Sequence, residues 1–217
     1  MFPLGELTKS DVKHIALENK LEKFVTKPES MGICFIGSRN FQNFIKEYIS
    51  DKPGDFVNVD NAKIVGQHRG IHQWTLGQRT KLQGLPEAFF TARKCIENNT
   101  VYVAQGTNHP ILYTSLFFTS KAHWIHSVPE ELTRGEILEC NFKFQHTEEW
   151  TACEVCDTNQ GLIVKLSDQK RCITPGQYAV FSKNCECLGS ARIVNSGISN
   201  FSLNYLQNRG MMSNIKK

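Results

Sequence analysis

The chain has 217 residues and a mass of 24.7 kDa, enough for one large domain or for two to three small ones. With 40% hydrophobic and 21% charged residues it has a globular composition, and its net charge of +4 permits an anionic partner without requiring one. No apolar run approaches the ~18–20 residues of a membrane helix, and the first residues resemble neither a secretory signal nor a transit segment. We therefore expect no membrane span, no secretion and no targeting segment within this sequence.

Two helices are predicted near the start of the chain. The first is capped by Thr8 or Ser10, has Asp11 in its first turn and ends near Asn19. The second begins after Ser38 and ends before residues 52–54, Lys-Pro-Gly. Its apolar residues recur at helical spacing, which predicts that they face a core: Phe41, Phe44, Ile45, Tyr48 and Ile49.

Short extended segments follow from residue 54 onward. Residues 56–59 and 63–65 predict one hairpin, and residues 89–96 and 101–104 predict a second around the Asn98-Asn99 turn, closing a unit of roughly 60 residues. Strands dominate from Tyr113 to Val194, which predicts a small antiparallel barrel or a sandwich. The clearest of these strands are residues 136–144, 150–155, 161–166 and 177–181.

Charge is divided unevenly along the second half of the chain. Residues 129–160 contain 8 acids and 2 bases, whereas residues 162–217 contain 8 bases and 2 acids. The latter segment is a candidate surface for an anion, and the alternative is a solvated face with a frayed tail.

The eight cysteines are expected to be reduced thiols, because no secretion signal accompanies them. One alternative is a zinc site made of Cys153, Cys156, Cys185 and Cys187. Each pair lies in an alternating, strand-like stretch where cysteines can also face a core, so no metal site is predicted. The sequence also contains no G-x-G-x-x-G, no G-x-x-x-x-G-K-[ST] and no H-E-x-x-H motif, so it shows no known nucleotide loop.

One thiol, Cys34, is placed differently from the others. It lies in the apolar run 30–37, Ser-Met-Gly-Ile-Cys-Phe-Ile-Gly, followed by Arg39 and the expected start of a helix. A helix dipole and a cation would stabilise its thiolate and make the sulfur nucleophilic or able to carry a persulfide. The alternative is an inert cysteine in a short buried strand.

Four segments, taken in order, resemble the tRNA-specific 2-thiouridylases. They are residues 2–9, residues 29–41 with G-I-C-F-I-G, residues 75–79 with T-L-G-Q-R, and residues 174–189 with T-P-G-Q-Y-A-V-F. The resemblance runs from residue 1 to about residue 193, and Met31 and the short loop 83–87 are more similar to the mitochondrial branch of the family.

The resemblance implies an enzyme that thiolates C2 of the wobble uridine in tRNAs for Lys, Glu and Gln. An ATP-pyrophosphatase-type domain, marked by S-G-G-x-D-S, would use ATP and Mg²⁺ to adenylate the uridine. A persulfide on Cys34, loaded by a sulfur-relay donor protein, would then transfer sulfur to C2 with loss of AMP. An upstream cysteine of the family would finally form a disulfide with Cys34.

This sequence contains neither S-G-G-x-D-S nor the upstream cysteine. We therefore expect a truncated chain, the C-terminal half of the enzyme, without an ATP site and not competent by itself. The alternative is a non-catalytic tRNA-binding module derived from the enzyme. Its location is expected to be mitochondrial, with the transit peptide outside this sequence, or cytoplasmic if the chain is bacterial.

The implied fold class is α+β and mostly β. It comprises a remnant of the catalytic α/β domain at 1–37, a small central α+β tRNA-binding domain at 38–105, a C-terminal antiparallel β-barrel at 106–200 and a tail at 201–217. By alignment, Gln145, His146 and Gln177 are expected to contact tRNA. Gln145 stands where the family tends to have arginine, and a neutral amide cannot neutralise a phosphate. Binding through the basic C-terminal part is expected to be salt-sensitive.

Overall fold

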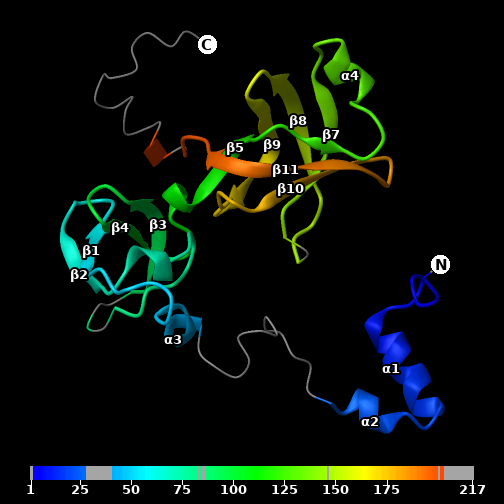
Figure 1. Ribbon diagram of the computed structural model, residues 1–217, viewed down its shortest axis with the longest axis horizontal. Helices are drawn as coiled ribbons and strands as arrows, with labels where there is room; N and C mark the ends of the chain where they lie inside the picture. Colours follow the sequence, from blue (N-terminus) through cyan, green and yellow to red (C-terminus); the bar gives the residue numbers. More distant parts are fainter. Residues whose placement is uncertain are drawn as a thin grey trace. The chain divides into compact units, whose positions relative to one another are not determined.

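The structure is a computed structural model that describes residues 2–27, 41–82, 84, 87–145, 147–199 and 201–202. The chain divides into two compact units, Met1–Ile49 and Ser50–Lys217. The first unit contains the helices α1 Lys9–Glu18, α2 Glu22–Val25 and α3 Phe41–Ile45 (Figure 1). No helix in these described ranges is long and apolar enough to cross a bilayer.

Helix α1 begins where the sequence predicts. The Thr8 hydroxyl accepts a hydrogen bond from the backbone N–H of Asp11, and the Asp11 carboxylate accepts one from the backbone N–H of Thr8 at 2.9 Å. This reciprocal cap satisfies two backbone donors that would otherwise lack partners. The hydrogen bond from the Thr8 side chain is also the main reason that the pKa of Asp11 is lowered.

The second predicted helix is shorter than expected. Helix α3 ends at Ile45, and turns follow it to Tyr48. Tyr48 is 70% and Ile49 43% exposed, so the prediction that these two residues face a core is wrong. The Tyr48 ring instead packs on Phe44, with 5.1 Å between centroids, so a local aromatic pair accounts for part of the apolar spacing. Ser38, the predicted cap, lies outside the described residues.

A four-stranded mixed sheet opens the second unit, and it contains both predicted hairpins. Its strands are β1 Gly54–Asn58, β2 Ile64–His68, β3 Phe89–Cys95 and β4 Thr100–Gln105, in the order β2-β1-β4-β3. Each hairpin is antiparallel, but β1 pairs with β4 in parallel. Two parallel strands need a long connection between them, and β1 and β4 have one, because β2, the 3-10 helix Ile71–Gln73 and β3 all lie between them in the chain. Phe56 anchors the core and packs edge-on against Trp74 at 5.0 Å.

Six strands of the second unit close into an antiparallel barrel. They are β5 Tyr113–Thr119, β7 Leu138–Lys143, β8 Thr151–Thr158, β9 Gly161–Arg171, β10 Tyr178–Lys183 and β11 Glu186–Ser196. The order is β10-β7-β8-β9-β5-β11, and a β10–β11 pairing closes the ring. The short strand β6 His123–Trp124 adds to β11, α4 Glu130–Thr133 precedes β7, and the 3-10 helix Pro110–Leu112 leads into β5. The predicted fold class is confirmed, and the barrel is selected over the sandwich.

Buried and exposed side chains alternate along the barrel strands, and the buried ones fill the interior. In β7, Leu138, Cys140 and Phe142 are buried while Glu139 and Asn141 are exposed. The same period of two in the other strands directs one set of side chains into the interior, where Phe117 and Phe142 pack at 4.8 Å between centroids.

The antiparallel register assigns each loop to one of two barrel ends. We call the end formed by loop 144–150, loop 172–177 and the start of β5 the proximal end. The distal end contains the tight turns 159–160 and 184–185 and the segment 120–137 with α4.

The T-L-G-Q-R motif lies where the sheet meets the barrel. Gly77 has φ +78°, and a Cβ there would lie 2.6 Å from Sγ of Cys172. Arg171, at the end of β9, donates to the carbonyl oxygens of Thr107 at 3.2 Å and Gly77 at 3.4 Å, and its guanidinium lies 5.2 Å from the centre of the Phe90 ring. The glycine of the motif is therefore required for close packing of the two substructures.

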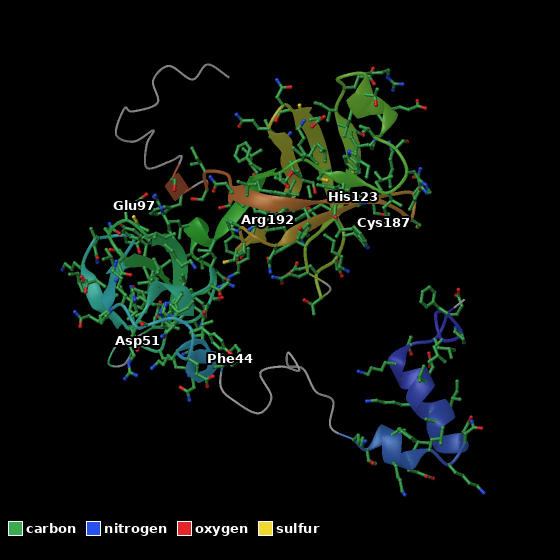
Figure 2. All side chains as sticks on the ribbon, in the orientation of Figure 1. Phe44, Asp51, Glu97, His123, Cys187 and Arg192 are labelled. Atoms are coloured by element: carbon green, nitrogen blue, oxygen red, sulfur yellow. The ribbon has the colours of Figure 1, made fainter. Side chains whose placement is uncertain are left out.

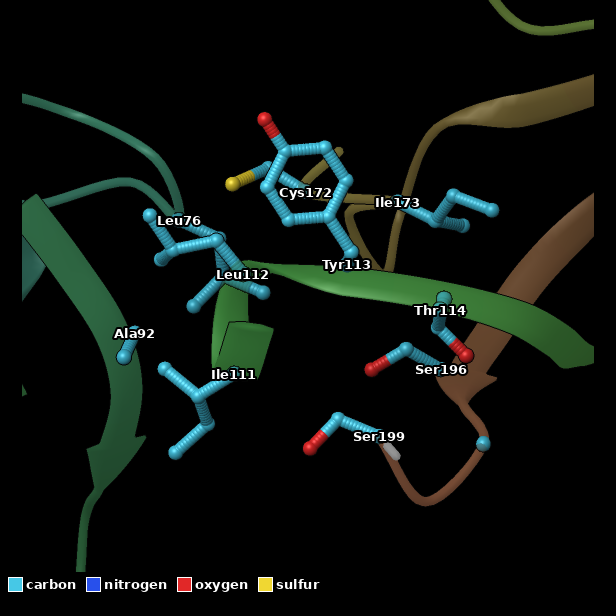
Figure 3. A pocket seen from close by; sticks show the side chains of 11 residues that line it. Leu76, Ala92, Ile111, Leu112, Tyr113, Thr114, Cys172, Ile173, Ser196 and Ser199 are labelled. Carbon is cyan, nitrogen blue, oxygen red and sulfur yellow. The ribbon is translucent and has the colours of Figure 1, made fainter. Parts of the chain in front are cut away.

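A small cavity beside this contact has a volume of about 40 Å³, close to that of one water molecule (Figure 3). Leu76 and Ala92 line it from the sheet side, and Leu112, Cys172 and Ile173 are among the residues that line it from the barrel side. Burial raises the pKa of the Cys172 thiol, which favours a neutral packing group. The cavity is too small for a substrate.

Because His68 is buried, we predict that the free energy of unfolding decreases in acid. Burial is the main cause that lowers its pKa, opposed by the Asn99 backbone and the charge of Asp55. Because the folded pKa is below the unfolded value of 6.5, the unfolded chain binds the proton more tightly. The contribution of His68 to the free energy of unfolding should therefore be complete above pH ~6.5 and should be lost progressively as the pH decreases below that value.

Urea unfolding between pH 7.5 and 5 would measure this loss. His68→Leu should flatten the pH dependence, whereas His123→Leu, at an exposed position on β6, should leave it unchanged. An equal pH dependence in wild type and His68→Leu would contradict the assignment.

Candidate nucleic-acid interface

The structure places two of the four predicted site residues. Gln145 is exposed in the β7–β8 loop, and Gln177 is half-buried in the β9–β10 loop. The strand register brings both loops to the proximal end of the barrel, although 32 positions separate the two residues in the sequence. Cys34 and His146 lie outside the described residues.

Gln177 is held by its backbone in a tight turn. Its N–H donates to the Thr174 carbonyl at 3.3 Å, and its own carbonyl accepts from the N–H of Ile193 at 2.8 Å. Gly176 has φ +96°, which favours glycine directly before it. The side-chain amide oxygen of Gln177 is buried and accepts no hydrogen bond from the described residues. Because this oxygen is buried, a bound RNA could reach it only after the Gln177 side chain turned outward.

Two exposed aromatic side chains accompany these glutamines, each beside a cation. Tyr178 is 58% exposed and lies directly opposite the exposed Arg192 across the β10–β11 pair. Trp150 is 48% exposed, and the Lys143 ammonium lies 5.6 Å from the centre of its ring. Figure 2 labels Arg192 on β11. Aromatic faces stack on unpaired bases and cations neutralise phosphates, so this pairing suits single-stranded nucleic acid.

Arg192 belongs to the basic C-terminal segment that was predicted to face an anion, whereas Tyr178, Trp150 and Lys143 were not predicted as site residues. The sequence did contain one feature that could have identified two of them: Trp150 and Tyr178 are aromatic residues that directly flank expected loops. Their exposure and their cationic neighbours depend on the register and could not be read from spacing.

Charge is less segregated in the structure than along the sequence. Three bases of the C-terminal segment pair with acids of the preceding segment: Lys165 with Glu154 at 2.9 Å, Lys170 with Glu148 at 3.4 Å, and Lys183 with Glu131 at 2.7 Å. The hydrogen bond from Lys183 is the main cause that lowers the pKa of Glu131. Three of the eight bases in residues 162–217 are therefore paired with acids, and the interpretation of this segment as an anion-facing surface stays a prediction.

Arg192 differs from those three lysines, since it makes no ion pair with a described residue. Arg171 is turned toward backbone carbonyls and the Phe90 ring instead. Arg192 and Lys143 are thus the bases of the proximal end that are best placed for a phosphate.

The zinc alternative fails on geometry. Cys153 is buried and Cys156 exposed, because three positions along a strand place side chains on opposite faces. Cys185 and Cys187 are exposed at the β10–β11 turn, where Figure 2 labels Cys187. Within the described ranges, no group of three or more His, Cys, Asp or Glu side chains could hold a metal ion.

Comparison with known proteins gives three family matches along the chain. Residues 1–38 match a model described as the tRNA methyl transferase HUP domain. Residues 42–105 match the tRNA methyl transferase PRC-barrel domain, and residues 114–193 the aminomethyltransferase beta-barrel domain.

Curated relatives match over most of this chain. The mitochondrial tRNA-specific 2-thiouridylase 1 of Drosophila melanogaster is 44% identical over 198 residues, which are 90% of this chain and 51% of the relative. The Homo sapiens protein of the same name is 41% identical over 215 residues, 98% of this chain and 51% of the relative. The tRNA-specific 2-thiouridylase MnmA of Bacillus subtilis is 39% identical over 196 residues, 89% and 52% of the respective chains. The chain thus spans about half the length of the curated relatives it matches.

Proposed function

Since the chain belongs to the tRNA-specific 2-thiouridylase family, we propose that it is the tRNA-holding and sulfur-delivering part of an enzyme that makes 2-thiouridine in tRNA. The substrate is the wobble uridine of tRNAs for Lys, Glu and Gln. The proximal end of the barrel binds the RNA, and Cys34 carries the persulfide. The names of the animal relatives support a mitochondrial location.

One observation carries the tRNA-binding part of this proposal. Gln145 and Gln177, expected from the family resemblance to touch tRNA, lie at one barrel end together with the Tyr178–Arg192 and Trp150–Lys143 pairs. Stacking surfaces and cations in one place suit a splayed, single-stranded anticodon.

The sulfur-transfer part rests on resemblance and on thiol chemistry. The terminal sulfur of the Cys34 persulfide forms a bond to C2 of the adenylated uridine, and AMP leaves with the former C2 oxygen. A second cysteine then attacks the inner sulfur of Cys34, which leaves the transferred sulfur on C2 and forms a disulfide. ATP and Mg²⁺ supply the activation, and since this sequence contains no S-G-G-x-D-S motif, we assign their site to a segment outside it.

The domain division at 1–37, 38–105, 106–200 and 201–217 is part of the same proposal. The central sheet and the barrel would grip the RNA, and the first segment would present Cys34.

A second candidate function is tRNA binding without catalysis, because the S-G-G-x-D-S motif that the family resemblance implies for the ATP site does not occur in these 217 residues. The chain would then be a tRNA-binding module without catalysis. Sequencing the transcript upstream of Met1 separates the two functions. An in-frame S-G-G-x-D-S followed by a cysteine supports the enzyme, and a stop codon before Met1 supports the module.

The tRNA-binding surface is tested by alanine substitutions at the proximal end. Tyr178→Ala is expected to weaken binding of an unmodified tRNA for Lys about tenfold through lost stacking. Arg192→Ala should weaken binding and reduce the slope of log affinity against log salt by about 1. Fluorescence anisotropy over a series of salt concentrations measures both effects.

Arg134→Ala is the matched control, because Arg134 is an exposed base that follows α4 at the distal end. This variant should leave the affinity and the salt slope nearly unchanged. Wild-type affinity in both proximal variants, or an equal loss in Arg134→Ala, would contradict the assignment of the proximal end.

A further inference from the structure

Two thiols inside the barrel lie next to each other. Cys140 on β7 and Cys153 on β8 are directly opposite in the antiparallel register, and their sulfur atoms are 3.6 Å apart. Opposed residues in such a pair have Cα atoms roughly 4.5–5.5 Å apart, which is within the range that a disulfide spans. Closing the sulfur atoms to the disulfide bond length of about 2.05 Å needs side-chain rotation and only a small strand movement.

The pair is also within reach of a small reagent. Cys140 is 8% and Cys153 5% exposed, and both residues line a surface hollow of about 340 Å³. The other lining residues are mostly polar or charged, including Glu139, Glu154 and Ser167. A molecule of the size of hydrogen peroxide can therefore approach the sulfur atoms without unfolding the barrel.

The two thiols are not chemically equivalent. Hydrogen bonding from Cys153 is the main cause that lowers the pKa of Cys140, and the positive charge of Lys183 lowers it further, against burial and the charge of Glu131. The same interaction and burial raise the pKa of Cys153. Cys140 is thus the residue suited to react as a thiolate, and Cys153 is suited to remain protonated as its neighbour.

We propose that Cys140 and Cys153 form a redox modification site, which a peroxide oxidises to a cross-strand disulfide. The Cys140 thiolate attacks one peroxide oxygen, giving a sulfenic acid and hydroxide. Cys153 then attacks the sulfenic sulfur, the S–S bond forms, and the sulfenic oxygen leaves as water. The two thiols are oxidised by two electrons, one peroxide is reduced to two waters, and a dithiol reductant restores the pair by exchange.

The disulfide would link the two strands of the β7–β8 hairpin below its loop, at the Cys140–Cys153 pair. The segment between the two cysteines, residues 141–152, contains the loop with Gln145 and the Lys143–Trp150 contact. A covalent link at Cys140 and Cys153 restricts opening of this hairpin. The inference uses only the two strands and does not depend on the proposed function.

The test is peptide mapping after oxidation of the reduced chain with a small excess of hydrogen peroxide. Free thiols are alkylated in urea, and trypsin then separates residues 135–143, which contain Cys140, from residues 144–165, which contain Cys153 and Cys156. We expect these two peptides to be linked and the link to be lost on treatment with dithiothreitol. Because Cys156 lies in the same peptide, the Cys156→Ala variant is mapped in parallel, and the link should persist in it.

Cys140→Ala and Cys153→Ala should each abolish the link, and a melting curve checks that each variant is folded. The oxidised wild type should also exchange the amide hydrogens of residues 144–150 more slowly than the reduced form and melt roughly 5 °C higher. The proposal is overturned if both thiols are alkylated after oxidation while exposed Cys187 is consumed, or if the link disappears in Cys156→Ala.

Discussion

Replacing Cys34 by serine is expected to abolish formation of 2-thiouridine by a protein that joins this chain to the ATP domain implied by its family. A hydroxyl cannot accept a sulfane sulfur, so no persulfide forms and the activated C2 receives no nucleophile from this position. Affinity for tRNA should stay within about twofold of wild type, because the proposed binding surface is on the barrel and a Cys-to-Ser change adds no charge. Mass spectrometry of nucleosides from reacted tRNA measures the product.

Cys156→Ser is the control for this experiment, since Cys156 is an exposed thiol on the outer face of β8. It should retain full thiolation. A Cys34→Ser protein that still makes 2-thiouridine would remove Cys34 from the mechanism and leave only the tRNA-binding part of the proposal. Loss of tRNA binding in this variant would instead indicate a structural role.

Replacing Gly161 by alanine is expected to destabilise the barrel by about 3 kcal/mol or more. Gly161 begins β9 after the tight turn 159–160, with φ +145°, a region that only glycine adopts readily. A Cβ at this position would lie 2.0 Å from the Thr119 carbonyl oxygen and 2.7 Å from the Ser120 carbonyl carbon. Both are backbone atoms of the neighbouring β5 and its loop, so no side chain can move aside to relieve the contact.

Gly135→Ala gives a reference for the cost of a positive φ without a steric contact. Gly135 also has positive φ, +74°, but a Cβ there meets nothing within 4 Å. The Gly135→Ala substitution should lower the free energy of unfolding by only about 1 kcal/mol, through backbone strain. Urea unfolding of both variants gives the comparison, and equal losses would show that the contact with β5 contributes nothing.

Local features of this protein were predictable because short-range physics determines them. Thr8 and Asp11 form a cap within one turn, and both hairpins of the sheet are antiparallel neighbours joined by turn-forming residues. The alternation of buried and exposed positions in β7 and β8 was likewise visible as a period of two. Motif resemblance supplied Gln145 and Gln177, which composition and spacing alone do not single out.

The same local rules failed at the second helix. The spacing from Phe41 to Ile49 satisfies a helical stripe, yet helix α3 ends at Ile45 and Tyr48 is exposed. An apolar stripe shows which residues would share a face, but a partner surface must exist before that face is buried.

Long-range pairing decided the rest. The sequence by itself determined the strands, the turns between them and the family resemblance, since these depend on residues close together in the chain. Only the tertiary structure decided that β10 pairs with β11 to close a barrel, that β1 runs parallel to β4, and that Lys183 is paired with Glu131. It also decided that Gln145 and Gln177 share one end and that Cys140 faces Cys153. The physical reason is that strand register is set by burial across the whole barrel, so contacts between distant residues are not contained in the spacing of either segment.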